Sequence, residues 1–203
     1  MKKINFSDRY RLTQAVLEGR KTMTRRIITC PREFKGKWVA GFYVYKRMSD
    51  NAIIDWPCMY DDNEIAFDEG EILPKYKIGE VVAIAQRYSE IGIDPFPFCE
   101  AGWNNKMFVR SDLMPHHIRI TDVRVERLQD ISDEDCLKEG VIKRFHSPAC
   151  RNFYYVPNVE VKSKDDVYLT SQEAFSALID RISCKGTWKS NPYVFVYEFE
   201  LID

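Results

Sequence analysis

The sequence has no excess of charge of either sign and no hydrophobic run of membrane-spanning length. Its 203 residues carry 30 Lys and Arg against 31 Asp and Glu. A general polyanion binder usually carries basic residues across its whole domain, so any contact with nucleic acid must rely on a local basic patch. No apolar stretch approaches the ~20 residues that cross a bilayer. We therefore expect a soluble protein that does not enter the membrane.

The sequence also lacks the common signatures of metal, redox and nucleotide-hydrolysing sites. None of the six cysteines has another at C-x-x-C or C-x₄-C spacing. No charged-then-apolar leader follows Met1, so free thiols in a reducing cytoplasm are expected. His116 and His117 face apart on a strand, and His146 falls in a loop. With no phosphate-binding glycine loop, G-x-S-x-G turn or H-E-x-x-H pair, we expect neither a metal site nor a cofactor.

Capping residues and apolar spacing predict three helices, at 7–19, 132–140 and 170–182. Each begins at a Ser or Thr that can serve as N-cap, and glycine ends the first two. Ser132 and Thr170 are each followed three residues later by an acidic residue, which is the spacing of a capping box. The third segment also has apolar residues at helical spacing.

The other periodic segments predict strands. Residues 193–201 alternate with a period of two and place their aromatic residues on one face, which is predicted to face inward. Residues 117–128 change phase near Thr121 and Asp122, which predicts a bulge or corner such as small barrels use to curve. Shorter strands are predicted at 79–86 and, as a pair bent at Gly41, at 37–46.

The chain is predicted to form one domain over residues 1–203. Its 45% hydrophobic and 30% charged residues are typical of a globular protein. Three segments combine Pro, Asp, Asn and Lys with scattered aromatics and have no sustained period. We expect these to be insertions in a compact β-rich domain, near 46–76, 88–107 and 142–168.

The stretch LEGRKTMTRR, residues 17–26, concentrates positive charge around two threonines. One interpretation is a helix end followed by an edge strand with solvated charges. The other is a loop that recognises an anion or a carbonyl group. Lys21 and Thr24 would face apart in a regular strand, so they can converge only if a turn or bulge intervenes. Gly19 permits such a turn at the start of the segment.

Glu139 occupies an unusual place in the second predicted helix. It falls in the last turn, where a carboxylate faces the negative end of the helix dipole. An exposed carboxylate there costs about 0.3–1 kcal/mol. Surface helices tolerate that cost, and a nearby cation would also offset it.

Four segments in order resemble the ASCH family, a branch of the PUA-like small β-barrels. The first follows the family's G-[RK]-K-T-x-T-x-R pattern, the second resembles its G-D-x-(apolar) strand, and the last two are similar to segments of phage and prophage members. Together they cover about half of the chain, and the ordered set is more specific than any one of them. The segments are LEGRKTMTRR, KIGEVVAIAQRY, ITDVRVERLQDISDEDCLKEGV and TWKSNPYVFVYEF.

The resemblance implies an α+β fold, a PUA-like small mixed β-barrel with flanking helices and long loop insertions. Small bacterial members of the family are amidohydrolases that remove the acetyl group from N4-acetylcytidine with a lysine, a threonine and a glutamate. Matched position by position, these are Lys21, Thr24 and Glu139. In this hypothesis Thr24 is the nucleophile, Lys21 is its base, and Glu139 orients the lysine or relays the proton to the leaving amine.

The resemblance also implies partners, namely a small nucleoside or single-stranded or modified RNA. Gln86 stands where phage-type relatives usually carry a glutamate, and a glutamine cannot act as a general base. A non-catalytic module that binds RNA or a modified base, and a phage or prophage accessory protein acting through protein contacts, remain alternatives. The candidate ligand-binding residues are Arg20, Thr22, Arg25, Arg26 and Gln86.

Overall fold

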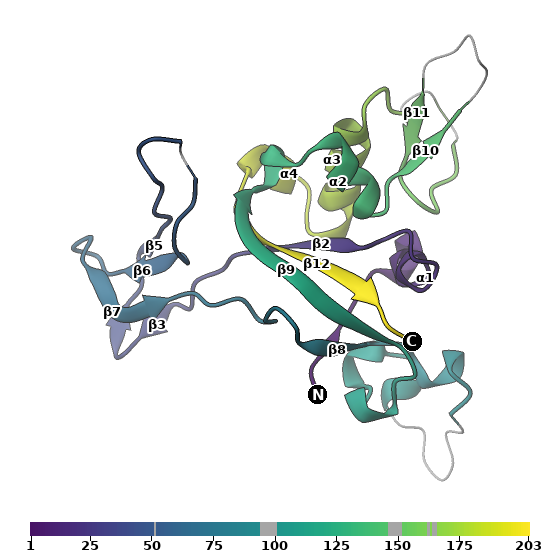
Figure 1. The fold of residues 1–203 in the computed structure, drawn as a ribbon, viewed down its shortest axis with the longest axis horizontal. Coiled ribbons are helices and arrows are strands. Elements are labelled where there is room, and N and C mark those ends of the chain that lie inside the picture. Colours follow the sequence, from purple (N-terminus) through teal and green to yellow (C-terminus); the bar gives the residue numbers. More distant parts are fainter. Residues whose placement is uncertain (51, 94–100, 146–151, 162, 164–165) are drawn as a thin grey trace.

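A five-stranded sheet forms the centre of the molecule in the computed structural model (Figure 1), which describes residues 1–203 except 51, 94–100, 146–151, 162 and 164–165. Its strands follow the order β1-β8-β9-β12-β2. The β1–β8 pair is parallel and the other three pairs are antiparallel. The strands are β1 (Lys3–Ile4), β2 (Met23–Ile27), β8 (Val81–Ile84), β9 (His117–Arg127) and β12 (Tyr193–Leu201).

The strand predicted at 193–201 is confirmed as β12, which pairs with β9 on one side and β2 on the other. Val194 and Val196 are as deeply buried as the aromatic residues that alternate with them, so the centre of this strand is covered on both faces. The predicted bulge is also confirmed. Glu198 pairs with Asp122 and Phe199 with Ile120. Thr121 is therefore the extra residue in β9. Figure 1 shows β9 as a long, curved strand.

The helices are α1 (Leu12–Leu17), α2 (Asp133–Lys138), α3 (Ser171–Ile182) and α4 (Thr187–Ser190). The caps of α2 and α3 are confirmed, because Ser132 accepts a hydrogen bond from the Asp135 amide and Thr170 forms a full capping box. The prediction of a single helix over residues 7–19 is wrong. Arg11 has a left-handed backbone with φ of 49°, which separates the short 3₁₀ helix η1 (Asp8–Tyr10) from α1.

The segments predicted as insertions lie outside the central sheet and contain structure of their own. Residues 46–76 hold most of the three-stranded sheet of β5 (Gly41–Tyr43), β6 (Cys58–Tyr60) and β7 (Ala66–Glu71). Figure 1 shows this sheet at the left, apart from the centre, although Trp56 still packs edge-on against Phe195. Parts of the segments 88–107 and 142–168 lie outside the described residues. The described parts contain β10 (Ile142–Arg144), β11 (Phe153–Tyr155) and the 3₁₀ helices η2 (Tyr88–Glu90), η3 (Ala101–Trp103) and η4 (Lys106–Phe108).

The strand pair predicted at 37–46 is only partly present. β4 (Lys37–Trp38) pairs with β3 (Glu33–Phe34), whereas β5 pairs with β6. The two strands therefore belong to different sheets and do not pair with each other. Two further 3₁₀ turns flank β9, namely η5 (Ser111–Leu113) and η6 (Leu128–Asp130).

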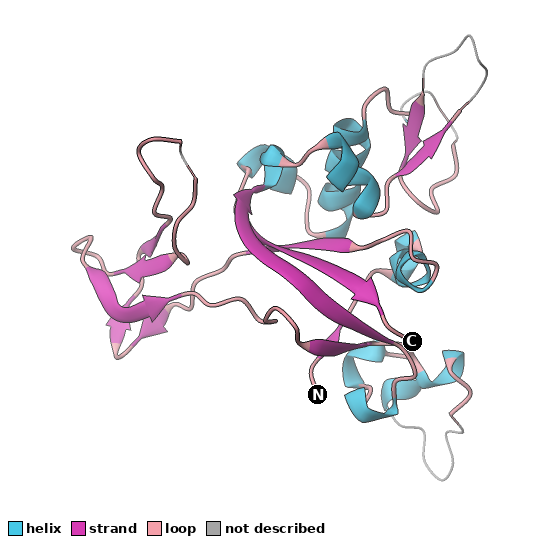
Figure 2. Ribbon diagram, in the orientation of Figure 1, coloured by secondary structure: helices cyan, strands magenta, loops and turns pink. Residues whose placement is uncertain are grey.

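The architecture is mixed α+β, with α2, α3 and α4 gathered along one side of the central strands (Figure 2). In the described part of the chain β1 and β2 are the two ends of the strand order, and no backbone ladder joins them. Their edges nevertheless approach, because Arg26 in β2 donates to the Asn5 carbonyl just after β1, at 2.6 Å. No helix within the described ranges is long and apolar enough to cross a membrane.

Candidate active site

Lys21 lies in the turn between α1 and β2, so the alternating side-chain directions of a strand do not apply to it. Gly19 has a φ of +69°, and the amides of Arg20 and Lys21 both donate to the Ala15 carbonyl at 2.9 Å. This turn closes the end of α1, and β2 begins only at Met23. Lys21 and Thr24 can therefore approach the same space, which a continuous strand would forbid.

The Lys21 ammonium is buried against the end of α2. Its Nζ donates to Glu139 Oε2 at 2.6 Å, to the Glu139 carbonyl at 2.8 Å and to the Met23 carbonyl at 2.7 Å. Lys21 is 2% exposed and Glu139 5%. All three ammonium protons thus have acceptors. Glu139 is the C-cap residue of α2, and this cation offsets the unfavourable position of its carboxylate at the negative end of the helix.

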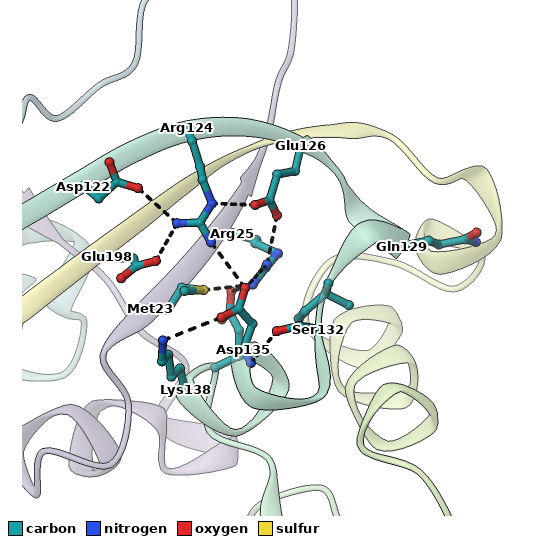
Figure 3. A network of polar contacts seen from close by, with 12 residues as sticks. Met23, Arg25, Asp122, Arg124, Glu126, Gln129, Ser132, Asp135, Lys138 and Glu198 are labelled. Atoms are coloured by element: carbon teal, nitrogen blue, oxygen red, sulfur yellow. Dashed lines mark hydrogen bonds and ion pairs between the residues drawn. The ribbon is translucent and has the colours of Figure 1, made fainter. Parts of the chain in front are cut away.

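Arg25 joins the same cluster from β2, with its guanidinium buried among carboxylates. It contacts Glu126 and Asp135 at 3.0 Å and Glu139 Oε1 at 3.4 Å. Arg25 was predicted to bind a ligand, but its Nη atoms are occupied by the protein's own acids. Figure 3 shows Arg25 beside Arg124, which contacts Glu126 and Asp135 as well.

The ion-pair network around Arg124 was missed from the sequence. Besides the acids that it shares with Arg25, Arg124 pairs with Asp122 at 3.0 Å and Glu198 at 2.5 Å (Figure 3). The alternation of Asp122, Arg124 and Glu126 in β9 was the available signal, because residues two apart share a strand face. This network holds β9, β12 and α2 together around the buried cluster.

A cavity of about 50 Å³ lies beside the Lys21–Glu139 pair. Lys21, Thr24 and Glu139 line it together with Asn5, Arg25 and Arg26, and Leu178 and Ile179 of α3 form part of an apolar wall. The Thr24 hydroxyl has no hydrogen-bond partner among the described residues, although Thr24 is only 5% exposed. The wall of this cavity therefore contains a hydroxyl that is free to interact with a ligand.

Burial lowers the pKa of the Lys21 ammonium below its ordinary value, because a charged group loses hydration in the interior. Glu139 opposes this shift, whereas the positive charges of Arg26 and Arg25 add to it. The net direction is downward despite the 2.6 Å contact with the carboxylate. A lowered pKa is what a lysine needs to act as a base near neutral pH.

The other predicted ligand residues are dispersed. Arg26 lines the cavity, whereas Arg20 is exposed and pairs with Glu18 at 2.6 Å. Thr22 is half-buried and outside the cavity wall, with its amide bonded to the Lys138 carbonyl. Gln86 is buried but lines a different cavity, of about 610 Å³, and so does not join the Lys21 cluster.

No group of three or more metal-ligating side chains occurs in the part of the chain that the structure describes, and His146 lies outside it. No family model, curated protein or solved structure matches the chain. The geometry of the site itself is therefore the guide to its function. The cavity combines a buried lysine of lowered pKa, a carboxylate bonded to it and a hydroxyl without a hydrogen-bond partner in the part of the chain that the structure describes.

Proposed function

We propose that this protein is an amidohydrolase that removes a small acyl group from the exocyclic amine of a pyrimidine nucleoside, with N4-acetylcytidine as the reference substrate. The observation that carries this proposal is the buried contact of 2.6 Å between Lys21 and Glu139 on the wall of a cavity that Thr24 also lines. A nucleophile, a base and a group that holds the base are the three parts of an acyl-transfer site.

The reaction can be written with its protons balanced. In the desolvated cavity Lys21 first passes a proton to Glu139 Oε2, which leaves a neutral amine beside a neutral carboxylic acid. Thr24 Oγ1 then attacks the acyl carbonyl carbon as its proton moves to Lys21. The C–N bond breaks, and the leaving amine takes the proton held by Glu139. Water then hydrolyses the resulting threonine ester, which releases the acyl group as its carboxylic acid and restores the Thr24 hydroxyl.

The size of the cavity supports a small acyl group. Its volume is about 50 Å³, and a water molecule in the liquid takes up ~30 Å³. An acetyl group is of this scale, whereas a whole nucleoside is not. The apolar wall from α3 suits the methyl group. We infer that the pyrimidine and ribose remain outside this cavity.

We also propose that the central sheet is a PUA-like barrel. The bulge at Thr121 and the contact of Arg26 with the Asn5 carbonyl support this, because both bring the edges β1 and β2 toward each other. The ASCH resemblance would then describe the whole domain, with β5–β7 and β10–β11 as additions to it.

A non-catalytic module that binds RNA or a modified base is the second candidate. It is favoured by the three acceptors around Lys21 Nζ, which satisfy all three protons of the charged ammonium and would give that lysine a structural role. The two candidates differ in whether the free Thr24 hydroxyl forms a bond with the acyl group or only a hydrogen bond.

The test is chromatographic detection of cytidine released from N4-acetylcytidine. Thr24→Val replaces the hydroxyl with a methyl group of similar volume, so loss of the product would support Thr24 as the nucleophile. The matched control is Thr121→Val, the same substitution at the exposed bulge of β9, which should keep the wild-type rate. Product release by Thr24→Val at the wild-type rate would refute the assignment of Thr24 as the nucleophile. No release by the folded wild-type protein would refute N4-acetylcytidine as the substrate, and the binding module would then be the leading candidate.

A further inference from the structure

A larger groove adjoins the small cavity, and nothing in the proposed reaction uses it. Its volume is about 500 Å³, which is within the range of pockets that hold small molecules. Asn5 and Arg26 line both spaces. The groove runs along β2 and β12, and the segment before β8 forms its other side. Residues of this segment in the wall include Lys75 and Tyr76.

The groove has three cations and no acidic residue among its lining side chains. Lys3 donates to the carbonyls of Met107 and Val109, and Arg26 donates to the Asn5 carbonyl. Lys75 is exposed. None of these three cations has a carboxylate within ion-pair distance in the described ranges, in contrast to Lys21. The groove therefore has a positive potential that an anionic ligand can neutralise.

Aromatic rings in fixed orientations form part of the same wall. The rings of Tyr76 and Tyr197 meet edge-on at 5.3 Å. The Tyr76 hydroxyl donates to the Lys3 carbonyl, and the Tyr197 hydroxyl accepts from the Lys75 amide. Such a wall offers apolar surface for a flat heterocycle while its cations face the negative part of the same ligand.

Asn5 lies at the junction of the groove and the small cavity. Its Oδ1 is buried and has no hydrogen-bond partner among the described residues. A buried acceptor without a partner costs free energy, and a ligand donor would recover it. The N–H of an acylated exocyclic amine, placed with its acyl group in the small cavity, is a donor of this kind.

We propose that the groove binds the phosphate and base of a nucleotide, so that the acylated substrate is a nucleotide, free or within single-stranded RNA. This inference rests on the proposed function, because it places the acyl group in the cavity beside Lys21. The nucleotide phosphate contacts Arg26 and Lys75, and the base packs near Tyr76.

The experiment compares binding of cytidine, cytidine 5′-monophosphate and a single-stranded oligocytidine RNA by isothermal titration calorimetry at low and high salt. We expect the monophosphate to bind at least tenfold more tightly than cytidine, because a charge-assisted phosphate contact is added. The advantage should shrink in high salt. Tighter binding of the RNA than of the monophosphate would assign RNA as the source of the nucleotide, and equal binding would assign the free nucleotide.

Two charge reversals locate the phosphate. Lys75→Glu changes a groove residue, whereas Lys77→Glu makes the same change in net charge at an exposed lysine outside the groove wall. We expect Lys75→Glu to weaken monophosphate binding at least tenfold and to leave cytidine binding unchanged, with less than a threefold effect of Lys77→Glu. Equal effects of both reversals, or equal affinity for cytidine and its monophosphate, would refute the proposal that this groove binds a nucleotide phosphate.

The binding measurements and the test of the reaction can fail independently of each other. Phosphate-dependent binding without deacetylation of either N4-acetylcytidine or its 5′-monophosphate would retain the groove and reject the hydrolase. Release of cytidine without any preference for a phosphate would retain the hydrolase and reject the groove.

Discussion

Replacing Glu139 with Gln removes the one carboxylate that both Lys21 and Arg25 contact in the cavity wall. The Glu139 oxygens lie 2.6 Å from Lys21 Nζ and 3.4 Å from Arg25 Nη1. Whichever way the new amide is turned, its NH₂ group faces one of these two cations. Lys21 is then a buried ammonium that keeps only two carbonyl acceptors, the Met23 and residue-139 carbonyls.

We expect the free energy of unfolding to fall by about 3 kcal/mol. Removal of one partner from a buried ion pair typically costs ~3–5 kcal/mol, and this value is the lower end of that range. The lower end applies because the two carbonyl acceptors remain. With a urea m-value of about 2–3 kcal/mol per molar, the unfolding midpoint should fall by roughly 1–1.5 M. Circular dichroism at pH 7 measures this shift.

The cost should also depend on pH. The pKa of Lys21 is already below its ordinary value of 10.5 because of burial, and loss of Glu139 removes the main influence that raises it. Between the lowered folded pKa and the ordinary value, the unfolded chain binds more protons than the folded one, so stability rises with pH. The Gln variant should therefore recover part of its deficit between pH 7 and pH 9.5.

The control for Glu139→Gln is Glu134→Gln, on the exposed face of the same helix. Glu134 pairs with Lys138 one turn away, and its side chain is mostly exposed. Its loss should cost less than about 0.5 kcal/mol. A deficit of Glu139→Gln as small as that of the control, or one that stays constant up to pH 9.5, would refute the buried-pair reasoning.

Three further measurements test other parts of the structure. Gly140→Ala should lower the free energy of unfolding by about 1–3 kcal/mol and Tm by several degrees. Gly140 has a φ of +109°, and an added Cβ would lie 2.9 Å from the Leu12 side chain. An unchanged Tm would contradict this prediction. Thr170→Ala should cost about 1 kcal/mol in urea unfolding through loss of the capping box of α3, and an unchanged midpoint would be inconsistent with that cap. Burial raises the pKa of the Cys136 thiol to about 12, so iodoacetamide at pH 8 should label exposed Cys184 and spare Cys136; equal labelling in peptide mass spectra would exclude this.

Features that depend on near neighbours in the chain were predictable from the sequence. The α2 and α3 caps involve hydrogen bonds between residues three apart, and β12 follows from a period of two. The bulge at Thr121 was visible as a change of phase. Arg11 escaped prediction because nothing in its local sequence marks the left-handed backbone that divides the first helix.

The sequence suggested Lys21, Thr24 and Glu139 through a family resemblance, and their catalytic roles remain a prediction. What the sequence alone could not determine is the contact of Lys21 with Glu139, because the two are 118 positions apart. The same holds for the lowered pKa of Lys21 and for the separation of Gln86 from the site. Both depend on which surfaces the folded chain buries against each other. Local spacing determined the helix caps and strand periods, whereas only tertiary packing decided which of the charged residues are buried away from water and in contact with each other.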